Sequence, residues 1–375
     1  MVRILKIFWF CSSLWISTAY LHAQGQTSII LDRALRAVGA QGAQREIRSI
    51  HALAECVGPN GKYTTEVISA TNSRLMFKQV NSKAVVYQGF INGQLSWKKD
   101  HSTGELSLAD ESSAAVWRGH SFQQMVLEYS EFFRDLVFRG NERFAGKEAL
   151  KLNGKDFAGT PVDLFFDEQT DLFLGFSYNN PSNTEVEPIR IVVNEWKQIG
   201  NRKLPSKVTA SDKKGDFVLN FWKITLNEVD ETIFSVPPKI SAERELLEAH
   251  KQARAAHFAR DAKLLVAGFA DDFSEVRNGN IRKPTRDESL TRFQRYLSQS
   301  TFLEWEDISP PVIKVSDDAT MAYSLVHKKV RLLSPDENGK QVEETEVFAW
   351  MATYRKLKGE WKLTAMASTN TPEKE

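Results

Sequence analysis

The sequence predicts an α+β protein built from two domains, the first of which is a curved antiparallel sheet wrapped around helices. Through most of the first 230 residues, apolar side chains alternate with a period of two, which is typical of strands. Two shorter stretches with helical spacing interrupt this alternation. After Pro237 and Pro238 a long amphipathic helical pattern appears, followed by further strand patterns. The two prolines therefore mark the predicted boundary between the domains.

The first 23 residues have the features of a secretory leader. Arg3 and Lys6 give a basic start, residues 7–16 are apolar, and small residues follow, with candidate cleavage sites after Ala19 and Ala23. The apolar stretch is too short to span a bilayer, so a signal peptide is favoured over an N-terminal membrane anchor, which is the alternative. We therefore expect an exported protein, located in the periplasm of a Gram-negative bacterium.

Composition sets limits on the classes of function. The chain has 375 residues, of which 42% are hydrophobic and 11% aromatic, so it can bury a substantial core. Loss of the leader removes two basic residues and no acidic one, which changes the formal net charge from +1 to −1. A near-neutral chain with interspersed charges lacks the electrostatic features of a nucleic-acid-binding protein. It also lacks the basic clusters that hold proteins on anionic lipid, although peripheral membrane contact is left open.

A helix is predicted over residues 28–38, where Gly39 stands at the position of a helix stop. A second helix is predicted over residues 121–138. Cys56, the one cysteine left after cleavage, cannot form an intramolecular disulfide and is predicted to be buried in a strand. Further strands are predicted over 63–68, 74–78, 84–88, 161–167, 171–178, 189–196, 204–210 and 217–226, with turns at Asn60-Gly61 and Asn92-Gly93.

Beyond the two prolines, apolar residues trace the core face of one long helix over residues 242–270. A short second helix is predicted over residues 287–297. Strands are predicted over 303–307, 311–315, 320–333, 342–356 and 361–369, with a hairpin turn at 334–339.

Residues 27–238 resemble the LolA/LolB-like fold of outer-membrane lipoprotein-sorting proteins. The resemblance rests on the segment 31–39 followed by strands, on the strand pair 162–167 and 170–174, and on the ending Phe234-Ser235-Val236-Pro237-Pro238. It implies a half-barrel of antiparallel strands with helices. It also implies an incomplete barrel lined by aromatic and aliphatic side chains, which would bind a hydrophobic or lipid-like molecule.

Residues 242–370 resemble the nuclear transport factor 2-like superfamily, which includes SnoaL-like and ketosteroid isomerase-like domains. The resemblance rests on the segment 269–276 with Asn278-Gly279, on the short helix at 287–297, and on the final strand that begins at Glu360-Trp361. It implies a cone-shaped α+β domain with a pocket. In isomerases and dehydratases of this superfamily, a pocket Asp or His acts as the base and a Tyr or second acid stabilises an oxyanion.

No catalytic set can be assigned from the residues. The chain has no G-x-S-x-G, H-E-x-x-H, phosphate-loop, paired C-x-x-C or dinucleotide motif. His250 and His257 are seven residues apart on one predicted helix, about two turns, which is too far for a simple metal-ligand pair and favours a solvated helix face. We therefore predict no metal and no cofactor.

Three residues of the second domain are weak catalytic candidates. Tyr323 and His327 project to one side of the strand 320–333, which we expect to be the concave side, and Asp272 lies at a helix-to-strand junction. None of them can be matched to a catalytic motif of the superfamily. The alternative is that His327 lies on an exposed edge and that the aromatic residues of these strands form the core.

The candidate ligand-binding residues are aromatic, because an apolar ligand needs an apolar lining. An ordinary packed core is the alternative that explains the same residues. The candidates are Trp97, Phe165, Phe176, Trp196 and Phe221 in the first domain and Trp350 in the second.

These observations favour an exported, non-catalytic protein that binds a hydrophobic or lipid-like ligand in the periplasm. Two alternatives stay open. The second domain could be a small-molecule isomerase or dehydratase of the ketosteroid isomerase-like kind. It could instead be a protein-interaction module that forms a homodimer.

The leader yields a direct prediction. The mature chain should begin at Tyr20 or Gln24, because cleavage is expected after Ala19 or Ala23. Sequencing the N-terminus of the protein isolated from its host checks this. An intact Met1 on a membrane-bound protein would instead establish the membrane anchor.

Overall fold

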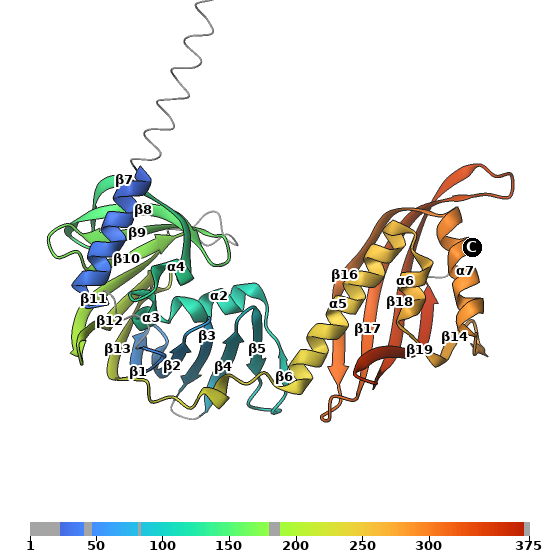
Figure 1. Cartoon of the computed structure of the whole chain (residues 1–375), viewed down its shortest axis with the longest axis horizontal. Helices are drawn as coiled ribbons and strands as arrows, with labels where there is room; N and C mark the ends of the chain where they lie inside the picture. The colour runs from blue at the N-terminus through green and yellow to red at the C-terminus, as the bar shows by residue number, and fades with distance from the viewer. Residues whose placement is uncertain (1–22, 41–46, 82–83, 180–187, 371–375) are drawn as a thin grey trace, which may run out of the picture. The chain divides into compact units, whose positions relative to one another are not determined.

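The computed structural model describes residues 23–40, 47–81, 84–179 and 188–370. The predicted leader therefore lies outside the described residues, except for its last position. The chain divides into two compact units, Met1–Ser235 and Val236–Glu375, next to the predicted boundary at Pro237. None of the described helices is long and apolar enough to cross a membrane. Both units combine largely antiparallel sheets with a few helices, which confirms a broad α+β fold (Figure 1).

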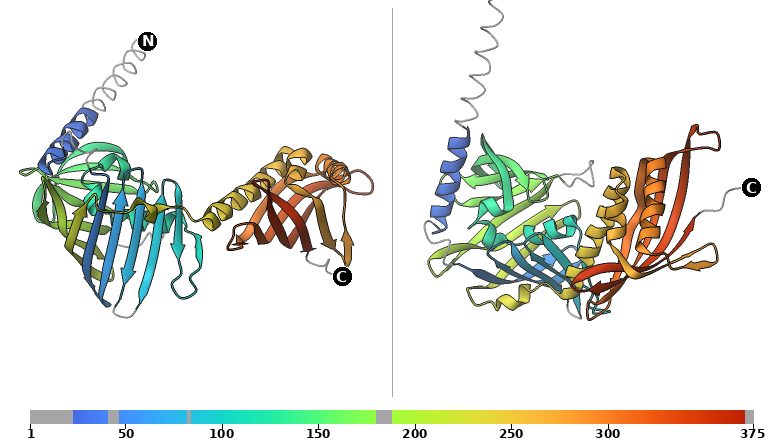
Figure 2. Two further views of the ribbon diagram at one scale, coloured as in Figure 1. Left: turned by 60° about the horizontal axis from the view of Figure 1, so that its bottom comes forward. Right: turned by 45° about the vertical axis from the view of Figure 1, so that its right-hand side comes forward.

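The first unit contains one sheet of thirteen strands, in the order β6-β5-β4-β3-β2-β1-β13-β12-β11-β10-β9-β8-β7. Every neighbouring pair is antiparallel, and the strands curve around the helices α3 and α4 (Figures 1 and 2). The strands are β1 (Ser49–Gly58), β2 (Gly61–Ala70), β3 (Arg74–Val80), β4 (Val85–Asn92), β5 (Leu95–Lys99), β6 (Leu106–Leu108), β7 (Phe133–Phe144), β8 (Lys147–Asp156), β9 (Pro161–Asp167), β10 (Phe173–Tyr178), β11 (Ile189–Ile199), β12 (Arg202–Asp212) and β13 (Gly215–Leu226).

The first helix is described from residue 23 to residue 37 and ends as predicted. Gly39 adopts a φ of 77°, and its N–H donates to the carbonyl of Arg36 over 2.9 Å. The N–H of Ala40 donates to the carbonyl of Leu35 over 2.8 Å, which completes a Schellman cap. Ile30 of this helix is buried in the main core of the unit.

The helix predicted over residues 121–138 is wrong in its second half. Only α3 (Phe122–Met125) and α4 (Tyr129–Phe132) are helical, and the strand β7 begins at Phe133. Phe133 pairs with Asp156 of β8, so the sheet provides the backbone hydrogen bonds that a helix would otherwise provide. Apolar spacing alone does not distinguish these two outcomes, because tertiary pairing overrides local preference.

The helix α2 (Glu111–Gly119) was not predicted. Its N-cap is Asp110, whose side chain accepts a hydrogen bond from the N–H of Ser113. Trp117 anchors α2 on the sheet and is fully buried among residues of β2 to β4. Gly89 makes this close contact possible, because a Cβ at that position would lie 2.4 Å from the Trp117 ring.

The second unit contains a six-stranded sheet in the order β15-β14-β19-β18-β17-β16. The pair β14–β19 is parallel and the others are antiparallel. Three helices lie along one face of the sheet (Figure 2, right). The elements are α5 (Pro238–Ala259), α6 (Ala262–Ala267), β14 (Phe269–Arg277), β15 (Asn280–Arg282), α7 (Arg286–Gln299), β16 (Thr301–Val315), β17 (Met321–Pro335), β18 (Gln341–Leu357) and β19 (Glu360–Asn370).

The single helix predicted over residues 242–270 is also wrong, because it is broken in two. Arg260 adopts a left-handed conformation with a φ of 55° and ends α5. Asp261 then caps α6 by accepting a hydrogen bond from the N–H of Leu264. The short helix predicted at 287–297 is confirmed as α7, which begins with a capping box between Thr285 and Glu288.

Candidate functional site

The interior of the first unit is a cluster of aromatic rings contributed by α4, β7, β9 and β10. The ring of Tyr129 lies 5.4 Å from that of Phe166 and 5.6 Å from that of Phe173, both in edge-to-face geometry. Phe173 in turn lies 6.4 Å from Phe176, and Phe176 lies 5.8 Å from Phe133. Such contacts add to the stabilisation that comes from burying the rings. We call these five residues the ring cluster.

The structure places three of the predicted ligand-binding residues in or beside this interior. Phe176 belongs to the ring cluster, and Phe221 lies in the same hydrophobic core. Trp196 is partly buried and packs against that core. Trp350 belongs to the second unit, where it is partly buried and packs against the core, with its ring 6.2 Å from that of Trp305.

Trp97 and Phe165 lie outside the main core of the unit, so the structure does not bring them together with the other candidates. Phe165 faces the opposite side of the sheet, where its ring stacks on Phe144 at 4.0 Å. Trp97 stacks on Phe90 at 5.3 Å, on the side of the sheet covered by the 3₁₀ helix η2 (Glu231–Phe234). Alternation predicts that Phe165 and Phe166 point apart, but not which of them points inward.

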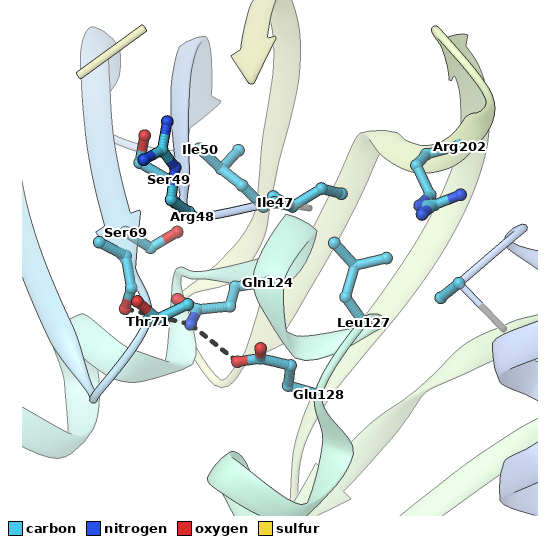
Figure 3. Close-up of a pocket in the computed structure, with 12 residues that line it drawn as sticks. Ile47, Arg48, Ser49, Ile50, Ser69, Thr71, Gln124, Leu127, Glu128 and Arg202 are labelled. Carbon is cyan, nitrogen blue, oxygen red and sulfur yellow. Dashed lines mark hydrogen bonds between the residues drawn. The ribbon is translucent and has the colours of Figure 1, made fainter. Parts of the chain in front are cut away.

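The interior is filled with side chains. The members of the ring cluster are buried, whereas atoms that lined a cavity large enough for water would keep accessible area. The hollow drawn in Figure 3 lies beside α3 and has a volume of about 10 Å³, barely enough for one water molecule. Its wall includes Gln124, which donates hydrogen bonds to the carbonyl of Ala70 and to the carboxylate of Glu128.

The segment 121–132, which contributes Tyr129 to the ring cluster, packs on the same core, and we call it the cover. It consists of α3 and α4, two helices of four residues each, and neither has a side-chain hydrogen bond at its N-cap. Helices of one turn have little stability of their own, so packing must hold the cover in place. Its side-chain hydrogen bonds to the sheet include Gln123 to the carbonyl of Pro205 over 2.9 Å and Ser73 to Glu131 over 3.1 Å.

Tyr129, from the cover, carries a polar group into this apolar interior. Its side chain is 3% exposed. Among the described residues, no hydrogen-bond partner reaches its hydroxyl. Burial raises the pKa of Tyr129 well above the usual range of tyrosine, so the phenol stays protonated. The sequence analysis missed Tyr129 because it falls in a stretch predicted to be one continuous helix.

The three weak catalytic candidates of the second unit do not meet in a pocket. Tyr323 and His327 lie on the face of β17 opposite to the helices, so the prediction that they line the concave side was wrong. The residues of β17 that face the helices include Ser324, Val326 and Lys328. The carboxylate of Asp272 lies 2.7 Å from Arg355, and its side chain is 66% exposed.

The helix-facing side instead holds a buried lysine. The side chain of Lys328 is 0% exposed, and its Nζ lies 2.8 Å from a carboxylate oxygen of Asp307 on the neighbouring strand β16. The ammonium is close enough for an ion pair but is not aligned for a hydrogen bond. It also lies 3.8 Å from the centre of the Trp305 ring, a cation–π distance.

Two histidines of α5 complete this group, which we call the lysine cluster. His250 Nε2 lies 3.0 Å from Asp307, and the His257 ring stacks on Trp305 at 4.2 Å. They do not form the solvated helix face that the spacing predicted. Desolvation lowers the pKa of both, to about 4 for His257. Desolvation lowers the pKa of Lys328, whereas pairing with Lys328 and His250 lowers that of Asp307 against the effect of burial.

In this arrangement the carboxylate of Asp307 pairs with both Lys328 of the sheet and His250 of α5, and so joins the helix to the sheet. Asp307 is 28% exposed at its side chain, whereas Lys328 behind it is inaccessible to solvent. A general base must reach its substrate, so the lysine cannot act without a rearrangement. Among the described residues, no group of three or more His, Cys, Asp or Glu side chains is placed to hold a metal ion.

Comparisons with known proteins yield similar solved structures at low sequence identity. No protein-family model and no curated protein matches the sequence. Similar solved structures include a LolA superfamily protein from Nitrosomonas europaea, with 13% identity over 56% of this chain and 97% of that chain, at a TM-score of 0.41. A DUF1329 family protein from Desulfovibrio piger has 12% identity over 56% and 97% of the two chains, at 0.40.

A third similar structure matches a smaller part of the chain. It is an NTF2-like protein of unknown function in nutrient uptake from Rhodospirillum rubrum, with 19% identity over 34% of this chain and 98% of that chain, at a TM-score of 0.28. The similar structures thus include LolA superfamily proteins over the first part of the chain and NTF2-like proteins over the last part.

The lysine cluster yields a prediction about stability. Asp307→Asn leaves a buried charge without its partner, so it should lower the free energy of unfolding of the second unit by about 3 kcal/mol. Lys328→Met removes the buried charge and should keep the stability within about 1 kcal/mol of the wild type, because apolar replacements of buried ion pairs are tolerated. Urea titration of each variant measures both values.

The control is Asp317→Asn. Asp317 also pairs with a lysine, Lys239 at 2.9 Å, but its side chain is 100% exposed, so stability should hardly change. Equal losses in the Asp307 and Asp317 variants would show that the buried lysine does not depend on its partner.

Proposed function

We propose that the first unit is an exported, non-catalytic binding module for an apolar molecule, which it holds between the cover and the sheet. The observation that carries the proposal is the mismatch between an extensive aromatic interior and the small cover that closes it. Two one-turn helices without side-chain caps are held largely by apolar contacts from residues such as Phe122 and Met125. An apolar ligand can replace such contacts with equivalent ones.

The energetic balance favours a ligand with a long apolar part. Lifting the cover exposes its own apolar side chains and those beneath it. Burial of a hydrocarbon chain contributes about 0.8 kcal/mol for each methylene group, so a chain of moderate length can offset that exposure. A lipid-like molecule fits this requirement better than a small polar one, because the ring cluster offers a single polar side-chain atom, the hydroxyl of Tyr129.

The resemblance of the sequence to lipoprotein-sorting proteins supports the same ligand class. Export to the periplasm, which rests on the leader, would place the protein where lipids must cross an aqueous compartment. We propose no chemistry for either unit, because Asp272, His327 and Tyr323 do not meet in a pocket and Lys328 is inaccessible.

The binding prediction uses two tryptophans. Methyl palmitate added to the full mature chain should shift the tryptophan emission and should be seen bound by native mass spectrometry. Trp196→Glu, at the rim of the interior, should weaken binding at least tenfold, because it places a charge against the apolar chain. Trp222→Glu is the matched control, since Trp222 is 60% exposed and lies next to Phe221 on the opposite face of β13.

Two results would contradict the proposal. The first is an unchanged emission together with a lipid-free mass. The second is an equal loss of binding in both variants, which would indicate a superficial site.

A specific feature of the second unit favours an additional role as a homodimer contact. The sheet face opposite its helices exposes Val312, Tyr323, Leu325 and Met351, and Leu325 is 45% exposed. These residues surround or adjoin a shallow hollow of about 380 Å³ whose walls carry no Asp, Glu, Lys or Arg. The hollow is lined by one titratable residue, His327, and the lysine and arginine farther along this face of β17 are paired with Glu304. Such a face can lie against its own copy without burying unpaired charge. We propose that a second copy of the chain covers it.

Sedimentation equilibrium tests this contact. The wild type should be a dimer, and Leu325→Glu should make it a monomer, because two charges would meet across the two-fold axis. Ile281→Glu, on the edge strand β15 at the other end of the sheet, replaces an apolar residue that is 74% exposed and should leave the dimer intact. A monomeric wild type at micromolar concentration would refute the proposal.

A further inference from the structure

The fully and partly buried tyrosines among the described residues differ in the partner of the hydroxyl. Tyr63 interacts with the thiol of Cys56, Tyr87 hydrogen bonds to the side chain of Ser113, and the hydroxyl of Tyr354 lies 3.4 Å from that of Ser324. Tyr129 is the tyrosine whose buried hydroxyl meets no partner among the described residues. Its ring packs against Phe166 and Phe173, so the surroundings of the side chain are apolar.

Such a hydroxyl is a cost to the folded protein. Burying a hydroxyl without a hydrogen bond loses its interactions with water and gains nothing in return. Phenylalanine would make the same ring contacts without that loss. Packing therefore explains the ring at position 129 but not the oxygen, and an oxygen of this kind calls for a partner.

The position of Tyr129 indicates where that partner lies. The residue belongs to the cover, and its ring meets residues of β9 and β10, so it stands between the cover and the sheet. A ligand held between these layers would meet the Tyr129 side chain first among the polar groups of the interior.

We infer that Tyr129 selects the ligand of the first unit, and that this ligand is an acyl compound whose neutral carbonyl oxygen accepts a hydrogen bond from the Tyr129 hydroxyl. The inference rests on the proposed binding function and specifies the chemistry of its ligand. A protonated phenol is a donor, so the partner must be an acceptor. The neighbouring rings disfavour a full charge, so an ester carbonyl fits better than an ionised carboxylate.

The experiment compares two probes on the full mature chain, methyl dodecanoate and tridecane, followed by tryptophan emission. Both have a similar apolar length, and only the ester has a carbonyl. The wild type should bind the ester at least tenfold more tightly than the alkane. Tyr129→Phe should remove this preference by weakening ester binding about tenfold while leaving alkane binding unchanged.

The same variant has a second readout that does not depend on a ligand. Tyr129→Phe should raise the melting temperature of the free protein, because it removes an unpaired buried oxygen and keeps the ring. The matched control is Tyr178→Phe, at a partly exposed ring 6.0 Å from Phe176, which should change neither the probe ratio nor the melting temperature.

The outcomes separate the inference from the function on which it rests. If the wild type binds both probes and Tyr129→Phe keeps the same preference for the ester, the inference is wrong and the binding function stands. A lower melting temperature in Tyr129→Phe would also overturn it, because the hydroxyl would then have a structural partner. If the wild type binds neither probe, the binding function fails and the inference with it.

Discussion

The alternation of side chains across the two sheets is the constraint on which the rest of the structure depends. Each strand presents every second residue to the face covered by helices, and that face must be buried. In the first unit this requirement creates one core, which includes Ile30 of the first helix and Phe166 of β9. In the second unit it places Lys328, rather than His327, beneath the helices. Both candidate sites follow from this choice of face.

Local signals predicted those parts of the fold that local chemistry determines. The end of the first helix at Gly39 required only a residue that accepts a positive φ. The capping box between Thr285 and Glu288 that begins α7 is also a local signal, but the helix at 287–297 was predicted without it. The broad α+β organisation followed from the change of period along the chain. The break at Arg260 was missed because an arginine gives no sequence signal of a left-handed conformation. A glycine at this position would have indicated the end of the helix.

The remainder depends on contacts between distant parts of the chain. Whether residues 133–138 become helix or strand depends on β8, which pairs with them. Whether Phe165 or Phe166 lines the interior depends on which face the helices cover, and alternation is symmetrical with respect to that choice. The lysine cluster brings together His250, Asp307 and Lys328 across 78 positions of sequence, with no motif spacing that would announce it. Sequence reasoning identified the aromatic residue types of the interior, but not the members that meet.

Lys328 and Tyr129 carry buried polar groups of two different kinds, one charged and one neutral. The ammonium of Lys328 has a counter-ion and an aromatic ring within 4 Å, so its burial is compensated inside the fold. The hydroxyl of Tyr129 is neutral and has no such compensation among the described residues. The compensated charge of Lys328 has a structural role, because its cluster holds α5 on the sheet. An uncompensated hydroxyl on the inner side of a weakly held cover has no such explanation within the fold. A ligand that is absent from the free protein and binds between the cover and the sheet is the simplest source of the hydrogen bond that the Tyr129 hydroxyl lacks.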